Sequence, residues 1–405
     1  MRTRTVAGTT PLDHVIVACQ ENRGFDHYFG YYPKAGLYGV PPAYTQPDGH
    51  GGVVRPHHLG SPITGNTTHD WRSIHGEWDN GRMDGFYTTN GSLALGYYDA
   101  GDLGYYYALA GAFALCGNFF CSLLGPTNPN RIYLGSATSG GATTNNIAHG
   151  SLTWPTVLDL LDQAGVDFKV YNGFGGVAAG FNPFSYFARW VDDPRVHRDD
   201  DEYFADLRDG TLPHFSFIVP NVVSCEHPPA SITWGQQYIQ HRVQALMQSP
   251  AWASSAFILT YDEGGGFFDH VPPPRLDAYG PGIRIPTLVV SPYARPGYIS
   301  PTLYDHGSIL KLVEAVFELS TLASINHQFD QRTPAANNDA AAPGSAYGPP
   351  AAPRDGNAAT GNLLDVFDFD QAPRATRILP PVVVEMDDQP GPGTEQRILQ
   401  AVRDA

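Results

Sequence analysis

The stretch Ala256-Phe-Ile-Leu-Thr-Tyr-Asp-Glu-Gly-Gly-Gly-Phe-Phe-Asp-His270 is the most telling part of this 405-residue chain. Residues 256–260 are mostly apolar and predict a buried strand. The strand runs into the acid pair Asp262 and Glu263, followed by three glycines and then Asp269 and His270. Carboxylates at the carboxyl end of a strand lie where open α/β sheets bind ligands, and oxygen ligands suit a divalent cation. A plain acidic loop would not need three glycines here, so we predict a metal site.

The bulk composition limits the partners of the chain. Asp and Glu number 40 against 24 Lys and Arg, which gives a formal net charge of −16 at pH 7. Because phosphate backbones need a basic surface, nucleic acid is excluded as a general partner. No apolar run is long enough for a transmembrane segment or a signal peptide, so we expect a soluble protein. The cysteines lack a metal-binding spacing and leave the disulfide state open; they are Cys19, Cys116, Cys121 and Cys225.

Short apolar runs alternate with helical patterns along the chain. This alternation is typical of an α/β fold with a mostly parallel central sheet and helices on both faces. Residues 34–89 show no sustained period and are expected to be irregular. The predicted strands are residues 14–19, 118–124, 167–171, 215–219, 256–260 and 286–291, and the predicted helices are residues 103–115, 155–164, 236–247 and 308–319, with one more beginning near residue 127.

The domain organisation is expected to be simple, with one domain over residues 1–405. Residues 331–360 are rich in Ala, Pro, Gly and Asn and predict a flexible surface loop. An apolar pattern resumes at residues 363–369, so the tail over residues 361–405 is expected to dock back on the domain.

Polar clusters follow four separate apolar runs. Any one of them is more simply explained as a turn cap, a loop ion pair or a surface group. Because the carboxyl ends of parallel strands meet at one edge of a sheet, their repetition favours a common site. The clusters are Glu21 and Asn22; Thr127, Asn130 and Arg131; Glu226 and His227; and Asp262 and Glu263, to which Asp305 and His306 add another acid and imidazole.

Thr127 is the best-placed candidate nucleophile. A hydroxyl at a helix N-terminus lies beside unpaired backbone N–H groups that can bind phosphate. A bound cation would lower the pKa of this hydroxyl. The alternative is that Thr127 only caps the helix, which is a common use of threonine. Ser136, Thr138 and Ser139 compete for the role but lie further into the predicted helix.

Five motifs together resemble the bacterial phosphoesterase family of non-specific phospholipases C and their acid-phosphatase relatives. They occur in the family's order over roughly residues 12–370. The family resembles in turn a branch of the alkaline-phosphatase-like superfamily. The motifs are Glu21-Asn-Arg-Gly-Phe-Asp-His-Tyr-Phe-Gly30, Thr127-Asn-Pro-Asn-Arg131, Glu226-His-Pro-Pro229, Tyr261-Asp-Glu-Gly-Gly-Gly-Phe-Phe-Asp-His-Val-Pro-Pro-Pro274 and Tyr304-Asp-His-Gly-Ser308.

The resemblance implies a phosphoric ester hydrolase with an alkaline-phosphatase-like fold. It implies a divalent metal held by Glu21, Asn22, Asp262 and Glu263, with the Thr127 hydroxyl as nucleophile and metal ligand. It also implies histidines around the phosphoryl group. For these we choose His69, His227 and His270, in falling order for direct phosphate contact. The expected catalytic set further includes Asn130 and Arg131, with Asp269, Asp305, His306 and Glu226 supporting the ligands from behind.

Several alternatives remain open at this point. The metal is Ca, Mg or Mn by its oxygen ligands, while nearby histidines would admit Zn or Fe. The substrate is a small-molecule or phospholipid phosphoester, with diester or monoester preference and oligomeric state undecided. The family is often secreted or periplasmic, which leaves the compartment uncertain. A catalytically inactive ligand-binding member of the same fold is the second hypothesis. Sulfatase chemistry ranks lower, because it needs a modified Cys or Ser where Thr127 stands.

Overall fold

One seven-stranded sheet organises the computed structural model, which describes residues 10–173, 181–325, 352–384 and 393–404. The strand order is β11-β6-β10-β9-β1-β8-β7. Only β10 pairs antiparallel, with β6 and β9, so the predicted mostly parallel sheet is confirmed. The strands are β1 (His14–Gln20), β6 (Ala114–Phe119), β7 (Phe168–Asn172), β8 (Phe215–Val219), β9 (Ser255–Tyr261), β10 (Leu288–Val290) and β11 (Tyr298–Tyr304).

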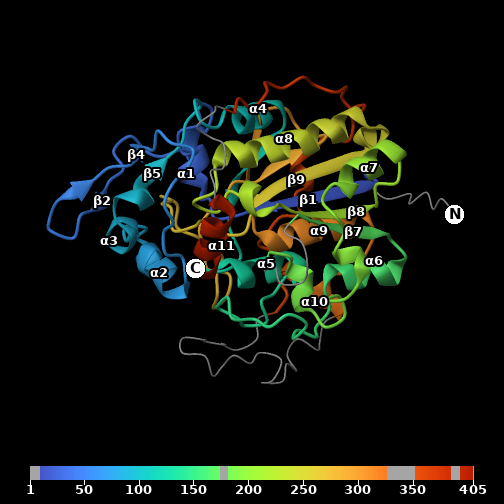
Figure 1. Cartoon of the computed structure of the whole chain (residues 1–405), viewed down its shortest axis with the longest axis horizontal. Coiled ribbons are helices and arrows are strands. Elements are labelled where there is room, and N and C mark those ends of the chain that lie inside the picture. Colours follow the sequence, from blue (N-terminus) through green and yellow to red (C-terminus); the bar gives the residue numbers. More distant parts are fainter. Residues whose placement is uncertain (1–9, 174–180, 326–351, 385–392, 405) are drawn as a thin grey trace.

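Helices cover both faces of this sheet, as predicted (Figure 1). All seven residues of β9 are buried, because a parallel strand covered on both faces has no solvent side. One face carries α4 (Gly104–Ala112), α7 (Glu202–Asp209) and α8 (Ile232–Gln248), and the other carries α5 (Thr127–Ser136), α6 (Val157–Ala164), α9 (His306–Val316) and α10 (Leu322–Ile325).

A cap of short elements lies beyond the carboxyl ends of β1 and its neighbours (Figure 1). The prediction that residues 34–89 are irregular is wrong in part, because helices occur there. Asp70 caps the first of them by accepting a hydrogen bond of 2.7 Å from the Ser73 N–H. The cap contains α1 (Phe25–Phe29), β2 (Gln46–Pro47), β3 (Val53–Val54), β4 (His57–His58), α2 (Trp71–Trp78), α3 (Phe86–Asn90) and β5 (Gly96–Tyr97).

Two strands differ from the sequence prediction. The strand predicted over residues 118–124 lies earlier, at β6, because α4 ends at Ala112 and the apolar run that follows pairs between β10 and β11. Strand β11 escaped prediction because it contains Pro301. Proline is tolerated there, since β11 is an edge strand and its register shifts between Ser300 and Leu303.

Described residues near the C-terminus, within 352–384 and 393–404, pack against the main hydrophobic core. Most of residues 331–360 lie outside the described residues. Leu363, Val366 and Phe367 are buried in the main hydrophobic core. The helix α11 (Thr394–Asp404) buries Ile398 in the same core. All four cysteines are buried and free, so no disulfide joins them. Within the described ranges, no helix is both long and apolar enough to cross a membrane.

Candidate functional site

The predicted metal ligands lie side by side because β1 and β9 are parallel neighbours. Gln20 pairs with Tyr261 at the end of the ladder, so the next residues of both strands leave the sheet together. Glu21, Asn22, Asp262 and Glu263 are each at most 1% exposed. The structure therefore brings together the four residues expected to hold a metal.

Hydrogen bonds tie these residues into one arrangement. The Asn22 N–H donates to Asp262 Oδ1 at 3.0 Å, and the Glu263 N–H donates to the same oxygen at 2.8 Å. Asn22 has a φ of 61°, in the left-handed region that asparagine tolerates better than most residues. Gly265 donates its N–H to Glu263 Oε2 at 2.7 Å. The backbone thus orients the acid pair.

Three oxygens of the cluster are buried without a hydrogen-bond partner among the described residues. They are Glu21 Oε2, Asn22 Oδ1 and Glu263 Oε1. Burial raises the pKa of both Glu21 and Glu263 well above its usual range, and the Asp262 carboxylate raises both further. Buried oxygens that lack partners are costly, and a divalent cation is the partner that hard oxygen ligands fit. By its chemistry the donor set therefore suits a metal ion, while the carboxylate oxygens of Glu21, Asp262 and Glu263 do not all lie within 4.8 Å of one another.

Arg131 is the cation that the structure places among these carboxylates. It is fully buried on α5, forms an ion pair with Glu21, and points Nε at Asp262 Oδ2 from 3.4 Å. The guanidinium also donates to the carbonyls of Cys19 and Gln20, at 3.2 and 3.3 Å. Arg131 therefore spans the ends of both strands and compensates part of their negative charge.

Thr127 precedes Arg131 by one helical turn. Residues at positions i and i+4 of a helix share a face, so Thr127 belongs to the face of α5 that meets the acid cluster. Its residue exposure is 5%. The N-cap of α5 is Pro126, so Thr127 begins the helix and is not its cap, contrary to the alternative considered from sequence.

Fewer backbone N–H groups are available at the start of α5 than the sequence suggested. The Asn128 N–H already donates to Asn145 Oδ1 at 2.9 Å, and Pro129 has no N–H. Asn130 holds the preceding loop: its Oδ1 accepts from the Leu123 N–H at 2.8 Å, and its Nδ2 donates to the Gly125 carbonyl at 2.9 Å. These contacts position Thr127, and a direct part for Asn130 in the chemistry stays a prediction.

Two of the three predicted histidines lie beside the cluster. His69 Nδ1 donates to the Thr67 carbonyl at 2.8 Å, which leaves Nε2 to accept from Asn22 Nδ2 at 3.0 Å. This bond directs the Asn22 amide oxygen away from His69 and makes it available as a ligand. His227 lies with its ring centroid 5.8 Å from that of His69. Its Nδ1 donates to the Pro228 carbonyl at 2.7 Å, and Nε2 is buried without a partner in the described part of the chain.

Burial lowers the pKa of both histidines. For His227 the value falls to about 3, with a further lowering by His69. Both rings are therefore neutral near pH 7, and His227 presents an unprotonated Nε2 to the site.

A side-chain clamp holds the segment that carries His69. Asn90 Oδ1 accepts from the Thr68 N–H at 2.9 Å, and its Nδ2 donates to the Thr68 carbonyl at 2.8 Å. The same Nδ2 donates to the buried Glu77 at 2.5 Å. Sequence reasoning missed Asn90 and Glu77, since no motif marks them and only the packing of α2 against α3 brings them together.

We expect Asn90→Ala to lower kcat for p-nitrophenyl phosphate by about tenfold, since His69 would lose its fixed place beside Asn22. The free energy of unfolding should fall by about 1–3 kcal/mol, because the buried Glu77 carboxyl loses its bond from Asn90, while water can replace the bonds to the exposed Thr68. Steady-state kinetics and thermal unfolding measure both. Thr88→Ala, on the same helix, is the matched control. Equal kinetics for Asn90→Ala and wild type would contradict a positioning role.

The third histidine belongs to a separate cluster. His270 Nδ1 contacts Asp26 Oδ2 at 2.6 Å, and Arg284 pairs with both Asp26 and Asp269, at 3.0 and 2.9 Å. Burial raises the pKa of Asp269 to about 6, although Arg284 opposes the shift. These residues tie the glycine-rich loop to α1. No contact in the described residues joins them to Glu21 or Asp262, so phosphate contact by His270 stays a prediction.

The remaining supporting residues surround the strand ends. His306 Nε2 donates to the Tyr261 carbonyl at 2.9 Å, just before the acid pair, and Asp305 accepts from Arg354 at 2.6 Å and from Ser122 at 3.2 Å. Burial raises the pKa of Glu226, although its hydrogen-bond donors oppose this. Its carboxylate accepts hydrogen bonds from Gln20 and from the hydroxyls of Tyr28, Tyr106 and Tyr261.

Two of the three glycines after the acid pair are required by close packing. A Cβ on Gly265 would lie 2.2 Å from the Asn22 carbonyl oxygen, and one on Gly266 would lie 2.7 Å from the Thr68 carbonyl oxygen. Both glycines have positive φ, at 65° and 74°. Protein segments therefore fill the space beside both glycines.

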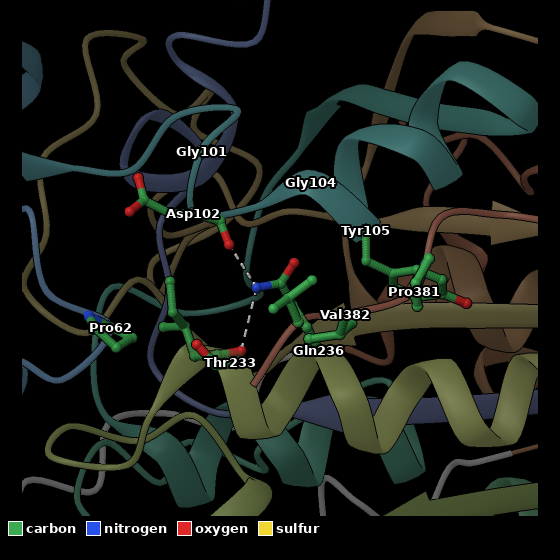
Figure 2. A pocket seen from close by; sticks show the side chains of 11 residues that line it. Pro62, Gly101, Asp102, Gly104, Tyr105, Thr233, Gln236, Pro381 and Val382 are labelled. Atoms are coloured by element: carbon green, nitrogen blue, oxygen red, sulfur yellow. Dashed lines mark hydrogen bonds between the residues drawn. The ribbon is translucent and has the colours of Figure 1, made fainter. Parts of the chain in front are cut away.

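Two pockets differ in their position relative to the acid cluster. A pocket of about 320 Å³ between α4, α8 and residues 381–383 is lined by none of the predicted site residues (Figure 2). In it, Gln236 donates a hydrogen bond to the Asp102 carbonyl at 2.8 Å. A pocket of about 450 Å³ lies instead against His69 and is bounded by residues 65–70, Pro229 and α11.

Comparison with known proteins identifies what this chain is similar to. A model of the Phosphoesterase family matches residues 12–320. The chain is 31% identical to a hemolytic phospholipase C of Pseudomonas aeruginosa, over 76% of this chain and 53% of that protein. It is also 31% identical to phospholipase C A of Mycobacterium tuberculosis, over 76% of this chain and 73% of that protein. The chain spans about half the length of the first relatives it matches.

Among solved structures, the chain shows a likeness to a protein in the alkaline phosphatase superfamily from Vibrio parahaemolyticus. That likeness has a TM-score of 0.40 and 11% sequence identity, over 76% of this chain and 68% of that chain.

Proposed function

Because the chain belongs to the Phosphoesterase family, we propose that it is a metal-dependent hydrolase of phosphate esters that works through a covalent phosphothreonine. One observation carries this proposal. Glu21 Oε2, Asn22 Oδ1 and Glu263 Oε1 are buried with no hydrogen-bond partner in the described part of the chain, and they lie near the helix that begins with Thr127. A site built this way has ligands for a cation and a hydroxyl on the adjoining face.

The residues present fit a divalent cation, with Glu21, Asn22, Asp262 and Glu263 as its holders together with the Thr127 hydroxyl. Such an ion would lower the pKa of the hydroxyl and compensate the charge of the phosphoryl oxygens. Oxygen ligands favour Ca, Mg or Mn, while the nearby neutral imidazole of His227 admits Zn.

The chain's own residues account for the bonds that change. Thr127 Oγ attacks phosphorus in line with the leaving alcohol, so that the Oγ–P bond forms as the bond from phosphorus to the alcohol oxygen breaks. The hydroxyl proton passes to a base, for which the unprotonated Nε2 of His227 is our candidate, and the departing alcohol oxygen takes a proton from this imidazolium or from water. Water then attacks phosphorus, the Oγ–P bond breaks and the Thr127 hydroxyl is restored. The sum is ester plus water giving alcohol plus phosphate.

Chelation is expected to abolish turnover of p-nitrophenyl phosphate, and a single added ion should restore it. Thermal unfolding should shift with the ion, because ligand at a hundred times its Kd stabilises a fold by about 2.7 kcal/mol. Full activity in excess EDTA with no shift in melting temperature would contradict metal dependence. Absence of turnover with every ion would instead favour an inactive ligand-binding protein.

Metal affinity is expected to rise with pH. The raised pKa values of Glu21 and Glu263 mean that the metal-free chain keeps these protons to higher pH than ordinary carboxyls do. Protons compete with the ion, so affinity is lost as pH falls through the raised values and regained above them. Calorimetric titration in two buffers of different ionisation enthalpy counts the protons released. Binding without proton release would contradict this account.

The ratio of turnover on p-nitrophenyl phosphate and p-nitrophenylphosphorylcholine separates the monoesterase from the diesterase. The relatives named phospholipase C favour a diester substrate for this chain as well. A higher turnover of p-nitrophenylphosphorylcholine than of p-nitrophenyl phosphate would support that assignment.

A further inference from the structure

We propose that Glu314 and Asp355 share one proton, and that this carboxyl pair holds the turn Arg354–Gly356 against α9 and α10 in a pH-dependent way. The pair lies outside the candidate metal cluster. It fastens the segment that braces α5, the helix that carries Thr127 and Arg131.

The two carboxyl groups are neighbours because successive backbone N–H groups of α10 bind them. The Leu322 N–H donates to Glu314 Oε1 at 3.3 Å, and the Ala323 N–H donates to Asp355 Oδ2 at 3.2 Å. The Asp355 carboxyl also lies within hydrogen-bond reach of Glu314. Their other oxygens, Oε2 and Oδ1, are buried with no hydrogen-bond partner in the described part of the chain. Two carboxylates can only accept, so a proton on one of them supplies the donor that is missing.

No basic side chain in the described ranges forms an ion pair with either carboxyl group. Lys311 lies one turn earlier on α9, but its Nζ donates to two backbone carbonyls beyond the turn, at 2.5 and 2.7 Å. Arg354 is directed toward Asp305 and Asp277, at 2.6 and 2.8 Å. Helix α10 has no ionisable side chain, and Glu318, which follows α9, is exposed. The charge of the pair is therefore reduced most directly by a proton.

Burial keeps one of the two acids neutral. Glu314 and Asp355 are 4% and 3% exposed. Burial, followed by the neighbouring Asp355 carboxylate, raises the pKa of Glu314 to about 10, although the Leu322 N–H and Lys311 oppose the shift. Glu314 therefore keeps its proton at pH 7 and donates it to Asp355.

The carboxyl pair closes a segment that reaches the helix of the candidate nucleophile. A Cβ on Gly356 would lie 2.5 Å from the Ala323 Cβ, so the turn packs tightly on α10. The Arg354 N–H donates to the Ala137 carbonyl at the end of α5 at 2.8 Å, and its guanidinium donates to the Tyr133 hydroxyl at 3.3 Å. Loss of the shared proton would place two carboxylates side by side at this contact, and the turn would loosen.

The contribution of the carboxyl pair to stability should fall as pH rises. Glu314 ionises near its ordinary value of 4.5 in the unfolded chain but keeps its proton to about 10 in the fold, so between these values the folded state binds one more proton. Glu314→Gln keeps a donor toward Asp355 and cannot ionise. In excess EDTA, the melting temperature of wild type should fall by about 3–5 °C more than that of Glu314→Gln between about pH 6 and about pH 9.

Asp206→Asn is the matched control, because Asp206 is a carboxylate with its own cation. Burial raises its pKa, but hydrogen bonds from Lys169 at 2.5 Å and Tyr171 at 2.7 Å outweigh burial and lower it overall. Asp206 is thus ionised in both the folded and the unfolded chain over the tested range. Its replacement should lower the melting temperature by the same amount at both pH values.

Asp355→Asn is a second, independent variant, since it removes the other acid and should also reduce the fall in melting temperature. Hydrogen exchange of residues 352–357, corrected for its intrinsic pH dependence, should show the turn loosening at high pH in wild type but not in Glu314→Gln. Parallel pH curves for wild type and both amide variants would overturn the shared proton. A larger loss of stability in both amide variants at the higher pH would indicate two carboxylates bridged by a cation, which overturns it as well.

Discussion

Thr127→Ala is expected to lower kcat for p-nitrophenyl phosphate by about a thousandfold or more, because the attacking oxygen is removed. The fold should survive, since no hydrogen bond in the described residues depends on this hydroxyl. Thr127→Ser should keep substantial activity, because it restores the oxygen on the same turn of α5. Rapid-quench labelling with a phosphorylated substrate would look for the phosphothreonine directly.

The matched control is Ser136→Ala, on the last turn of α5. The Ser136 hydroxyl lies 2.9 and 2.8 Å from the Ile132 and Thr138 carbonyls, which share its single proton, and it accepts from Trp154. Its loss should lower the melting temperature and leave kcat within about twofold of wild type. If Ser136→Ala were the inactive variant and Thr127→Ala the active one, the nucleophile would be misassigned.

Arg131→Ala is expected to be the most destabilising single change in the site, by about 3–5 kcal/mol. It would leave Glu21 and Asp262 buried without their shared cation, and the carbonyls of three further residues would lose the guanidinium as a hydrogen-bond donor. These carbonyls belong to Cys19, Gln20 and Phe181. The loss should be larger in EDTA than with saturating metal, because a bound ion would compensate the same carboxylates. Chemical denaturation with and without metal measures the difference.

Arg242→Ala provides the comparison for a buried arginine outside the site. Arg242 forms an ion pair with Asp200 and lies over the ring of Tyr238. Its replacement should destabilise the fold to the same extent with and without metal. If Arg131→Ala also lost equal stability in both conditions, Arg131 would have no connection to a metal centre.

Much of the fold follows from local pattern. The buried run before the acid pair, the alternation of strands and helices and the polar residues after β1 and β9 are all visible in the chain. The parallel arrangement then places Glu21 beside Asp262, because Gln20 and Tyr261 are paired neighbours. Two elements were not predicted from the sequence, and both omissions have local causes. Pro301 interrupts the strand pattern of β11, and the Gly- and His-rich surroundings of α2 obscure its helical pattern.

Roles within the cluster depend on contacts that local pattern does not encode. The sequence does not distinguish the surroundings of His69 from those of His270. In the structure, His69 accepts a hydrogen bond from Asn22, whereas His270 contacts Asp26 and Arg284. Arg131 is one polar residue among several in its motif, and only the packing of α5 places it between two acids. The backbone carbonyls of Asn22 and Thr68 approach Gly265 and Gly266 closely, and the local sequence does not show which segments these glycines accommodate.

The sequence alone therefore determined the α/β class and the candidate metal ligands. Both depend on where strands end and on which side chains follow them, and these are local properties of the chain. The separation of the histidines into two clusters, the Asn90 clamp and the carboxyl pair of Glu314 and Asp355 arose only on folding. Each joins segments tens to hundreds of residues apart, and such contacts are fixed by packing and burial rather than by neighbours in sequence.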